Sequence, residues 1–356
     1  MAQHNRHIAS LDGLRGFAAL AVFVAHAGSE GFVVLEHTYG LGKIGVALFY
    51  SLSGFLMAHL YLSRPWTKGE LHNYFVARFA RILPLFYVAV LFGTVVLYST
   101  GLSVYGFSRP AHIALNLGFV RGNGVLWSIP VEVQFYVLFA LLWGAHARGW
   151  LWPAALGLLV VQVGILLVLG ASENGSNALI YWLHYFVLGI TISRLYAHRG
   201  ADFDRLATHP AAGVVCAGLV VVSVLLMPGL RLALGWDPLP IYADPFVLVG
   251  VFLFVLLALL GQGPFWVFAS KPMCWLGARS FGIYLFHVPV LLIAERVLPA
   301  SWHHGGLGFV LALALTLLVA DLLNRLVERP AGRGIRTWLL RPAGSHPKTK
   351  SAPLAG

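Results

Sequence analysis

Long apolar stretches recur along the whole chain, and they constrain its fold more than any other feature. Ten of them are long enough to span a hydrocarbon core of about 30 Å, which takes about 20 helical residues. Their approximate extents are 9–28, 44–63, 82–100, 127–146, 150–170, 178–197, 211–228, 245–262, 274–294 and 306–327. Because 59% of the 356 residues are hydrophobic and only 10% are charged, a water-soluble globule is excluded. The sequence predicts an all-α integral membrane protein with about ten transmembrane helices.

The basic residues sort by side when these stretches are threaded through a membrane in alternation. With the N-terminus inside, 18 of the 24 Lys and Arg residues fall on the cytoplasmic side, five fall on the outer side, and Arg15 lies within the membrane. This asymmetry follows the positive-inside rule, so both termini are expected to be cytoplasmic. The net charge of +11 therefore indicates no nucleic-acid partner. We expect a multi-pass protein of the inner (cytoplasmic) membrane, with membrane lipid around it.

The domain organisation is expected to be simple. One transmembrane domain should cover residues 1–341, and the Pro-, Ser- and Lys-containing tail over residues 342–356 should be disordered and cytoplasmic. The interrupted amphipathic segment 103–120 is interpreted as a surface loop or an interfacial helix. The first apolar stretch also resembles a secretory signal, but Asp12 and Arg15 inside it favour a membrane span.

Arg15 and His26 are ionisable residues inside the first apolar stretch. They stand eleven positions apart. At 100° per residue this is close to three full turns, so both side chains face one way, about 16 Å apart along the helix. Such groups cost about 2.5–3.5 kcal/mol each in hydrocarbon and should therefore face a polar cavity lined by protein. The first helix is a candidate for the functional site.

Two further groups of residues, one at the start of the third stretch and one within the second, each allow two interpretations. Arg78 and Arg81 lie at the cytoplasmic level of Arg15, where their planar guanidinium groups suit phosphate binding. Snorkelling of these side chains at a helix end is the alternative. The small residues Ser53 and Gly54 either let another helix approach closely or make room for a thin substrate arm.

The fourth stretch carries one carboxylate. Ser128, Glu132 and Tyr136 follow at four-residue steps and share a face. By the parity of the spans, Glu132 is expected toward the outer side, at a depth comparable with His26. There it would orient an imidazole base or relay protons for it, unless it only neutralises a basic side chain.

The ninth and tenth stretches carry polar stripes. Ser280, Tyr284 and His287 share one stripe, which either hydrogen-bonds neighbouring helices or enters the site. In the tenth stretch an internal pair of Asp321 and Arg325 is the favoured account, and no catalytic role is assigned to it.

Metal binding and disulfides are not predicted. His303 and His304 are adjacent in an outer loop but have no companion at ligand spacing. Cys216 and Cys274 lie in or beside apolar stretches, with no spacing for a metal site and no loop placement for a disulfide.

Taken together, six motifs in order resemble the acyltransferase 3 family of integral membrane O-acyltransferases, and the resemblance runs nearly end to end. They are LDGLRGFAALAVFVAH, with Arg15 and His26; GVALFYSLSGFL; RFARILP, with Arg78 and Arg81; WSIPVEVQFY, with Glu132; LGARSFGIYLFHVP, with Tyr284 and His287; and the final ERP. The chain departs from the family pattern at Tyr50, where Phe is frequent, at Ala47, where an acidic residue is common, and at Phe281, where Tyr is common.

The resemblance implies transfer of an acyl group, most simply acetyl, from acyl-coenzyme A to a hydroxyl of a carbohydrate or another envelope or secreted acceptor. It implies that the donor is cytoplasmic and is bound by Arg15, Arg78, Arg81, Ser53 and Gly54. His26 is then a general base or a transient acyl carrier that Glu132 tunes, while Tyr284 and His287 position the acceptor or stabilise the oxyanion. Many relatives carry an extra outer hydrolase-like domain, so we expect this chain to finish the transfer alone or to hand over to a separate protein.

Two other classes of membrane protein remain. A transporter or flippase of a lipid-linked glycan also needs many spans and buried charges, although no repeated halves are evident. A polytopic glycosyltransferase that uses a lipid-phosphate sugar commonly needs an acidic pair in the first outer loop, where Glu30 and Glu36 stand.

Overall fold

The computed structural model describes residues 8–33, 40–169, 177–209, 211–236, 239–261, 263–303 and 306–340. Within these ranges the chain is helical and contains no β-strand, which confirms the predicted all-α membrane protein. The two ends of the chain, including the predicted tail, lie outside the described residues. The cytoplasmic placement of the termini stays a prediction.

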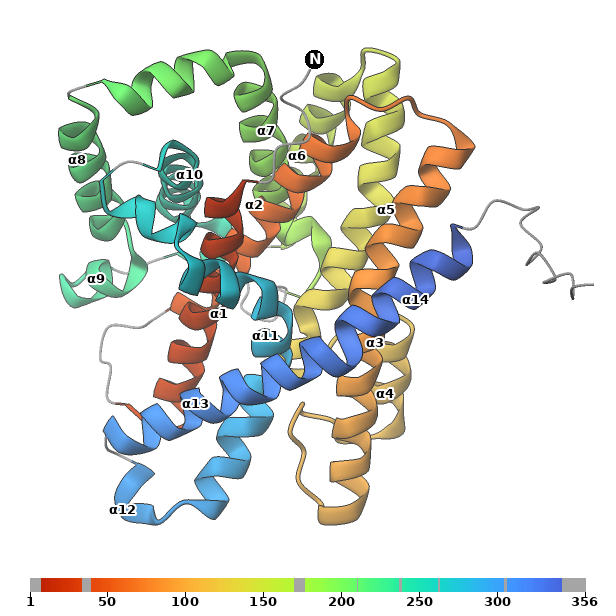
Figure 1. Cartoon of the computed structure of the whole chain (residues 1–356), viewed down its shortest axis with the longest axis vertical. Coiled ribbons are helices and arrows are strands. Elements are labelled where there is room, and N and C mark those ends of the chain that lie inside the picture. Colours follow the sequence, from red (N-terminus) through yellow and green to blue (C-terminus); the bar gives the residue numbers. More distant parts are fainter. Residues whose placement is uncertain are drawn as a thin grey trace, which may run out of the picture.

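The helices follow the apolar stretches closely (Figure 1). They are α1 (Ala9–Ser29), α2 (Leu41–Tyr61), α3 (Lys68–Thr100), α4 (Pro110–Leu117), α5 (Ser128–Ala147), α6 (Leu151–Leu169), α7 (Leu179–Thr208), α8 (Ala212–Leu225), α9 (Pro228–Ala233), α10 (Pro245–Leu260), α11 (Lys271–Val297), α12 (Ala300–His303), α13 (Gly306–Leu323) and α14 (Arg329–Leu339). A π-helical turn, Asn324–Glu328, joins α13 to α14. Short 3₁₀ turns are η1 (Gly124–Trp127), η3 (Ile241–Ala243) and η4 (Gly263–Ala269).

Each predicted span overlaps a helix, but the helices differ in length. Within the described residues, seven helical segments are long and apolar enough to cross a membrane, and α8 and α10 are shorter apolar helices. Helix α7 is long, but its C-terminal half carries charged residues such as Arg194 and Arg205. The figure of ten spans therefore stays a prediction.

The centre of the bundle is built on close contacts between backbones. Helix α1 packs along α11 and against α2, and α2 packs along α7. A Cβ atom on Gly277 of α11 would lie 1.9 Å from the backbone oxygen of Asp12, and one on Gly54 of α2 would lie 2.0 Å from the backbone oxygen of Phe186. Glycine is therefore required where these helices cross, because any side chain would force them apart.

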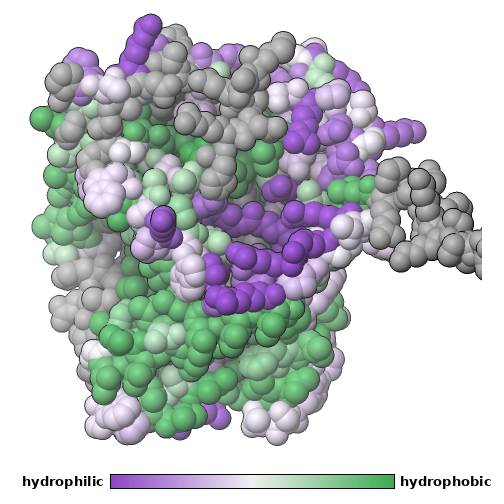
Figure 2. All heavy atoms as spheres, in the orientation of Figure 1, coloured by the Kyte–Doolittle hydropathy of each residue, from purple (hydrophilic) through white to green (hydrophobic). Residues whose placement is uncertain are grey.

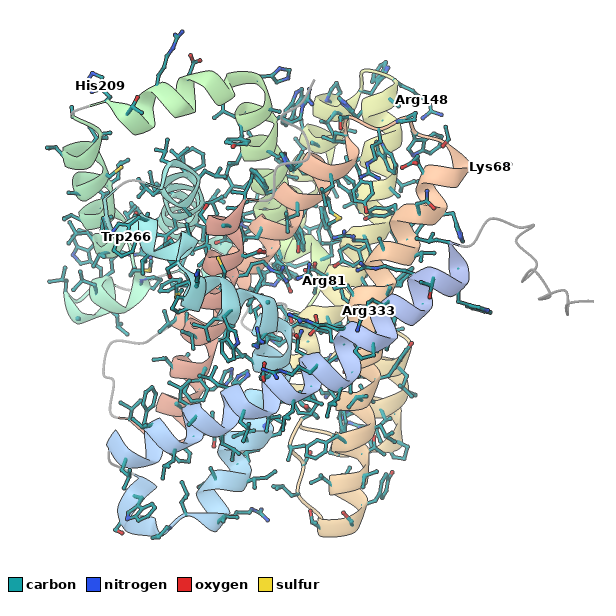
Figure 3. The ribbon with its side chains drawn as sticks, in the orientation of Figure 1. Lys68, Arg81, Arg148, His209, Trp266 and Arg333 are labelled. Atoms are coloured by element: carbon teal, nitrogen blue, oxygen red, sulfur yellow. The ribbon has the colours of Figure 1, made fainter. Side chains whose placement is uncertain are left out.

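The surface shows where lipid and water fit. Figure 2 shows a broad apolar surface over the lower part of one face and a band of hydrophilic side chains across its middle, over α11 and α14. In Figure 3, Lys68, Arg148 and His209 lie toward one edge of the bundle, whereas Arg81 lies near the middle of the view. Lys68 and Arg148 are two of the 18 basic residues counted on the cytoplasmic side, and they lie toward the same edge of the molecule.

The segment 103–120 is only partly as predicted. It contains the short helix α4, but Val104, Tyr105 and Phe107 are buried, so this stretch is not a surface loop. The Tyr105 hydroxyl donates a hydrogen bond to the backbone oxygen of Leu285 in α11, at 3.0 Å. Alternation of polar and apolar residues could not show that this loop folds back into the bundle.

Candidate active site

The packing of α1 on α11 sets the register of the site. A Cβ atom on Gly16 would lie 2.8 Å from the backbone nitrogen of Gly277, so the two helices touch at this level. Ten residues further along each helix, the rings of His26 and His287 lie 5.0 Å apart between centroids. The two helices therefore run side by side in the same direction.

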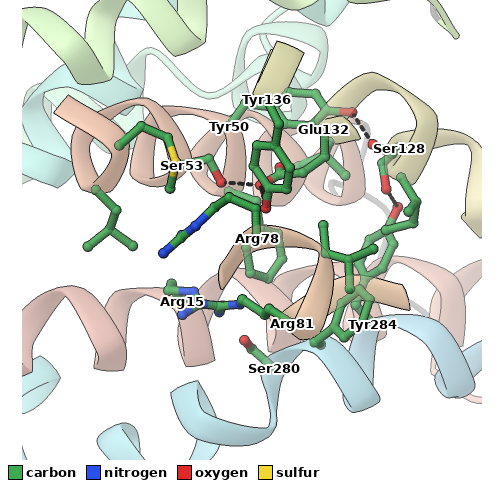
Figure 4. A pocket seen from close by; sticks show the side chains of 17 residues that line it. Arg15, Tyr50, Ser53, Arg78, Arg81, Ser128, Glu132, Tyr136, Ser280 and Tyr284 are labelled. Atoms are coloured by element: carbon green, nitrogen blue, oxygen red, sulfur yellow. Dashed lines mark hydrogen bonds between the residues drawn. The ribbon is translucent and has the colours of Figure 1, made fainter. Parts of the chain in front are cut away.

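The end of this pair of helices that carries Arg15 borders a narrow chamber of about 70 Å³, which we name the inner chamber (Figure 4). Arg15 from α1 and Arg78 and Arg81 from α3 line it, and Figure 4 shows their side chains gathered on one side. Within the described ranges none of the three makes a salt bridge, and the buried Nε of Arg78 has no hydrogen-bond partner. Guanidinium groups that converge in this way favour an anion between them.

Glu132 from α5 also lines the inner chamber. Its Oε1 accepts hydrogen bonds from the Ser53 hydroxyl, at 2.5 Å, and from the Tyr136 hydroxyl, at 2.8 Å. The structure thus brings Glu132 together with Ser53 and the arginines, and it does not place this carboxylate in the cavity that His26 lines. The parity of the spans gave the direction of α5 but not the depth of its side chains.

The end that carries His26 borders a wider cavity of about 590 Å³, which we name the outer cavity. His26 is half-buried and lines this cavity, together with Ser29, Lys43 and Trp127. Because its ring borders open space, His26 is the histidine that an acceptor entering this cavity can reach.

His287 is fully buried behind His26, with 0% of its surface exposed. Its Nδ1 lies 3.1 Å from the backbone oxygen of Ile283, and a carbonyl can only accept, so Nδ1 carries the proton. The Nε2 atom then holds a lone pair and has no hydrogen-bond partner among the described residues. His287 is buried and does not line the outer cavity, so a substrate in that cavity does not contact it directly.

Tyr284 stands between the two spaces. It and Val46 line both the inner chamber and the outer cavity, so the two cavities adjoin at this residue. The Ser128 hydroxyl donates to the Tyr284 hydroxyl at 2.7 Å, which ties α5 to α11 at the junction. Arg15 and His26, predicted to share one face of a helix, open into adjoining cavities.

Sequence reasoning assigned some residues incompletely. Of the two interpretations of Gly54, the structure supports close helix approach over room for the donor arm, because the α7 backbone fills the space beside it. Ser280 is fully buried with an unpartnered hydroxyl and lines the chamber. The sequence had already placed Ser280 on the same helix face as Tyr284. The pair of Asp321 and Arg325 is confirmed at 2.8 Å, but Asp321 also binds Arg279, a partner on another helix.

The described residues give little support to the acidic pair Glu30 and Glu36 or to a metal site. Glu36 and His304 lie outside the described residues. Burial and the nearby Glu295 raise the pKa of Glu30. Across the described ranges, no three His, Cys, Asp or Glu side chains lie close enough to hold a metal ion.

Comparison of the sequence with known proteins shows to which family this chain belongs. Residues 8–325 match the acyltransferase domain that defines the acyltransferase 3 family. The chain belongs to this family. It is 26% identical to the peptidoglycan O-acetyltransferase OatA of Listeria monocytogenes, over 91% of this chain and 56% of that protein. No solved structure matches the chain.

Two further relatives extend the comparison. YrhL of Bacillus subtilis, provisionally described as a peptidoglycan O-acetyltransferase, is 25% identical over 95% of this chain and 57% of its own length. SACOL0978 of Staphylococcus aureus, provisionally described as an O-acetyltransferase, is 22% identical over 95% and 59%. The acyltransferase 3 chain described here thus spans a little more than half the length of these relatives.

Proposed function

We propose that the protein is an O-acyltransferase that moves an acyl group, most simply acetyl, from acyl-coenzyme A to a hydroxyl of a carbohydrate. One observation carries this proposal. Helix α1 presents Arg15 in one cavity, together with Arg78 and Arg81 of α3, and the reachable His26 in the adjoining cavity. Family membership and the relatives described as O-acetyltransferases support the type of reaction.

The donor enters the inner chamber from the cytoplasm in this proposal. Arg15, Arg78 and Arg81 bind its phosphates through their planar donor groups. The pantetheine arm then extends past Tyr284 toward His26, over the roughly 16 Å that separate Arg15 and His26 along α1. Binding at one end thereby holds the thioester carbon beside the base at the other.

The chemistry takes place in the outer cavity. His26 removes the proton from the acceptor hydroxyl, and that oxygen attacks the thioester carbonyl. The Tyr284 hydroxyl donates a hydrogen bond to the developing oxyanion. When the tetrahedral intermediate collapses, the C–S bond breaks, the ester forms, and the coenzyme A thiolate takes the proton from His26. The buried ring of His287, 5.0 Å from that of His26 between centroids, limits how the His26 ring can turn.

The acceptor is proposed to be a glycan of the cell envelope. The outer cavity is the wider of the two, and it can admit a sugar. Peptidoglycan is the acceptor named in the descriptions of two relatives. We therefore infer a multi-pass enzyme of the inner membrane that takes its donor from one side and modifies a glycan at the other.

Transfer of radiolabel tests the proposal. Purified full-length protein in lipid nanodiscs is incubated with [¹⁴C]acetyl-coenzyme A and peptidoglycan fragments, and ester-linked label on the glycan is measured. We expect label on the glycan with the wild type and none above background with His26→Ala. Movement of a lipid-linked glycan across vesicles without any label transfer would instead identify a flippase.

A further inference from the structure

A third cavity, of about 250 Å³, adjoins the inner chamber on the side away from His26. Arg15, Arg81, Ser280 and Phe281 line both spaces. Most of the residues that line the third cavity but not the inner chamber lie in the π-helical turn after α13 and in α14. The full set is Gly277, Ala278, Asn324, Glu328, Arg329 and Arg336.

Helix α14 is held where its arginines reach this cavity. It crosses α3 at Gly332, where a Cβ atom would lie 2.9 Å from the backbone oxygen of Ala80, the neighbour of Arg81. Arg329 and Arg336 are seven residues apart, so they lie on one face of α14, about 10 Å apart. The helix crossing therefore adds two guanidinium groups next to Arg81.

The positively charged lining of the third cavity favours an anion. Four arginines line it against one carboxylate, that of Glu328, which accepts a hydrogen bond from the Asn324 amide at 3.0 Å. In the described chain, neither Arg329 nor Arg336 makes a salt bridge. The Ser280 hydroxyl is fully buried between the two cavities and has no hydrogen-bond partner there. A phosphate would satisfy these donors together.

We propose that Arg329 and Arg336 bind the 3′-phosphate of the donor's adenosine, so that the enzyme selects coenzyme A thioesters over acyl-pantetheine donors without that phosphate. This inference rests on the proposed function. In coenzyme A the order from the thioester is pantetheine, pyrophosphate, then the 3′-phosphorylated ribose. Passing inward from Tyr284, the structure offers the same order of cations, first Arg78, Arg15 and Arg81, then the pair on α14.

Binding of coenzyme A and of 3′-dephospho-coenzyme A to the purified full-length protein in nanodiscs tests the inference, by titration calorimetry. The wild type should bind coenzyme A at least about tenfold more tightly, as expected for charge-assisted hydrogen bonds to one phosphate. In Arg336→Gln and Arg329→Gln this preference should fall to about threefold or less. Their affinity for 3′-dephospho-coenzyme A should stay that of the wild type, which also shows that the variants are folded.

Arg333→Gln is the matched control. Arg333 lies on the same helix, but its Nε donates to the backbone oxygen of Arg329 and the residue does not line the cavity. This variant should keep the full preference for coenzyme A. Equal binding of both ligands by the wild type, or an equal loss of both in all three variants, would overturn the inference and leave the proposed function standing. Failure of the wild type to bind either ligand would overturn both.

Discussion

The inner chamber and the outer cavity differ in size, charge and polar partners. The inner chamber is narrow, about 70 Å³, and three arginines without salt bridges in the described chain line it. The outer cavity is wider, about 590 Å³, and presents His26, which is backed by the buried His287. In the proposed function, donor binding and bond making are therefore separated along the axis of α1. Helix α1 contributes to both, through Arg15 and His26.

The largest expected effect is at the outer cavity. We expect His26→Ala to lower kcat by about a hundredfold to ten-thousandfold, the usual contribution of a general base, with little change in the KM for acyl-coenzyme A. The measurement is steady-state transfer of label at saturating donor. His198→Ala, at an exposed position of α7, is the control and should keep wild-type activity. If His26→Ala raised only the donor KM, the division between the two regions would fail.

The next effect concerns the helix contact that keeps the two regions in register. In Gly277→Ala the new Cβ would lie 1.9 Å from the backbone oxygen of Asp12, so α1 and α11 must separate. We expect a lower Tm and about a hundredfold loss of activity, because a misplacement of about 1 Å between reacting groups costs that much.

Gly157→Ala in α6 is the matched control for this substitution. No atom lies within 4 Å of a Cβ at Gly157, so this variant should retain wild-type activity and a Tm at least as high. Thermal unfolding followed by tryptophan fluorescence measures both variants. Equal Tm values for the two variants would mean that the contact between α1 and α11 is not needed.

A smaller effect is expected at the inner chamber. Arg15→Lys keeps the positive charge but loses the planar pair of donors that suits a phosphate. We expect the KM for acyl-coenzyme A to rise about tenfold, with kcat at saturation nearly unchanged. Arg64→Lys, at an exposed pair with Glu70, is the control. A fall in kcat without a change in donor KM would place Arg15 at the chemistry instead.

The smallest effect sharpens the assignment of Glu132. In Glu132→Gln the amide oxygen can still accept from Ser53 and Tyr136, but the negative charge beside the arginines is lost. Donor affinity should therefore rise by about two- to fivefold, as removal of one nearby like charge allows. Initial rates over a range of donor concentrations measure this. A loss of kcat as large as that of His26→Ala would show instead that Glu132 serves the imidazole.

Much of the fold could be predicted because lipid imposes a simple rule on sequence. Apolar length alone located the helices, and the angle of 100° per residue placed Arg15 and His26 on one face. The same arithmetic could not place residues of different helices relative to one another. The depth of Glu132 depends on how α5 packs against α2, and the burial of Tyr105 depends on a loop that folds back onto Gly93 of α3.

The arginines of α14 show a second reason why prediction stopped short. The motif ERP was recognised, but Arg329 and Arg336 entered the sequence analysis only among the 18 basic residues counted on the cytoplasmic side. Only the crossing of α14 over Ala80, through Gly332, brings them to the site. Gly54 shows the reverse, since a glycine within a motif of the functional family proved to serve helix packing.

The most direct test of the two-region account is a structure of the protein with a non-hydrolysable thioether analogue of acetyl-coenzyme A, determined in nanodiscs by electron cryo-microscopy. The account predicts phosphate density on Arg15, Arg78 and Arg81 and the acyl end of the analogue beyond Tyr284, in contact with His26. An analogue whose acyl end stays among the arginines, or that binds away from this chamber, would contradict it.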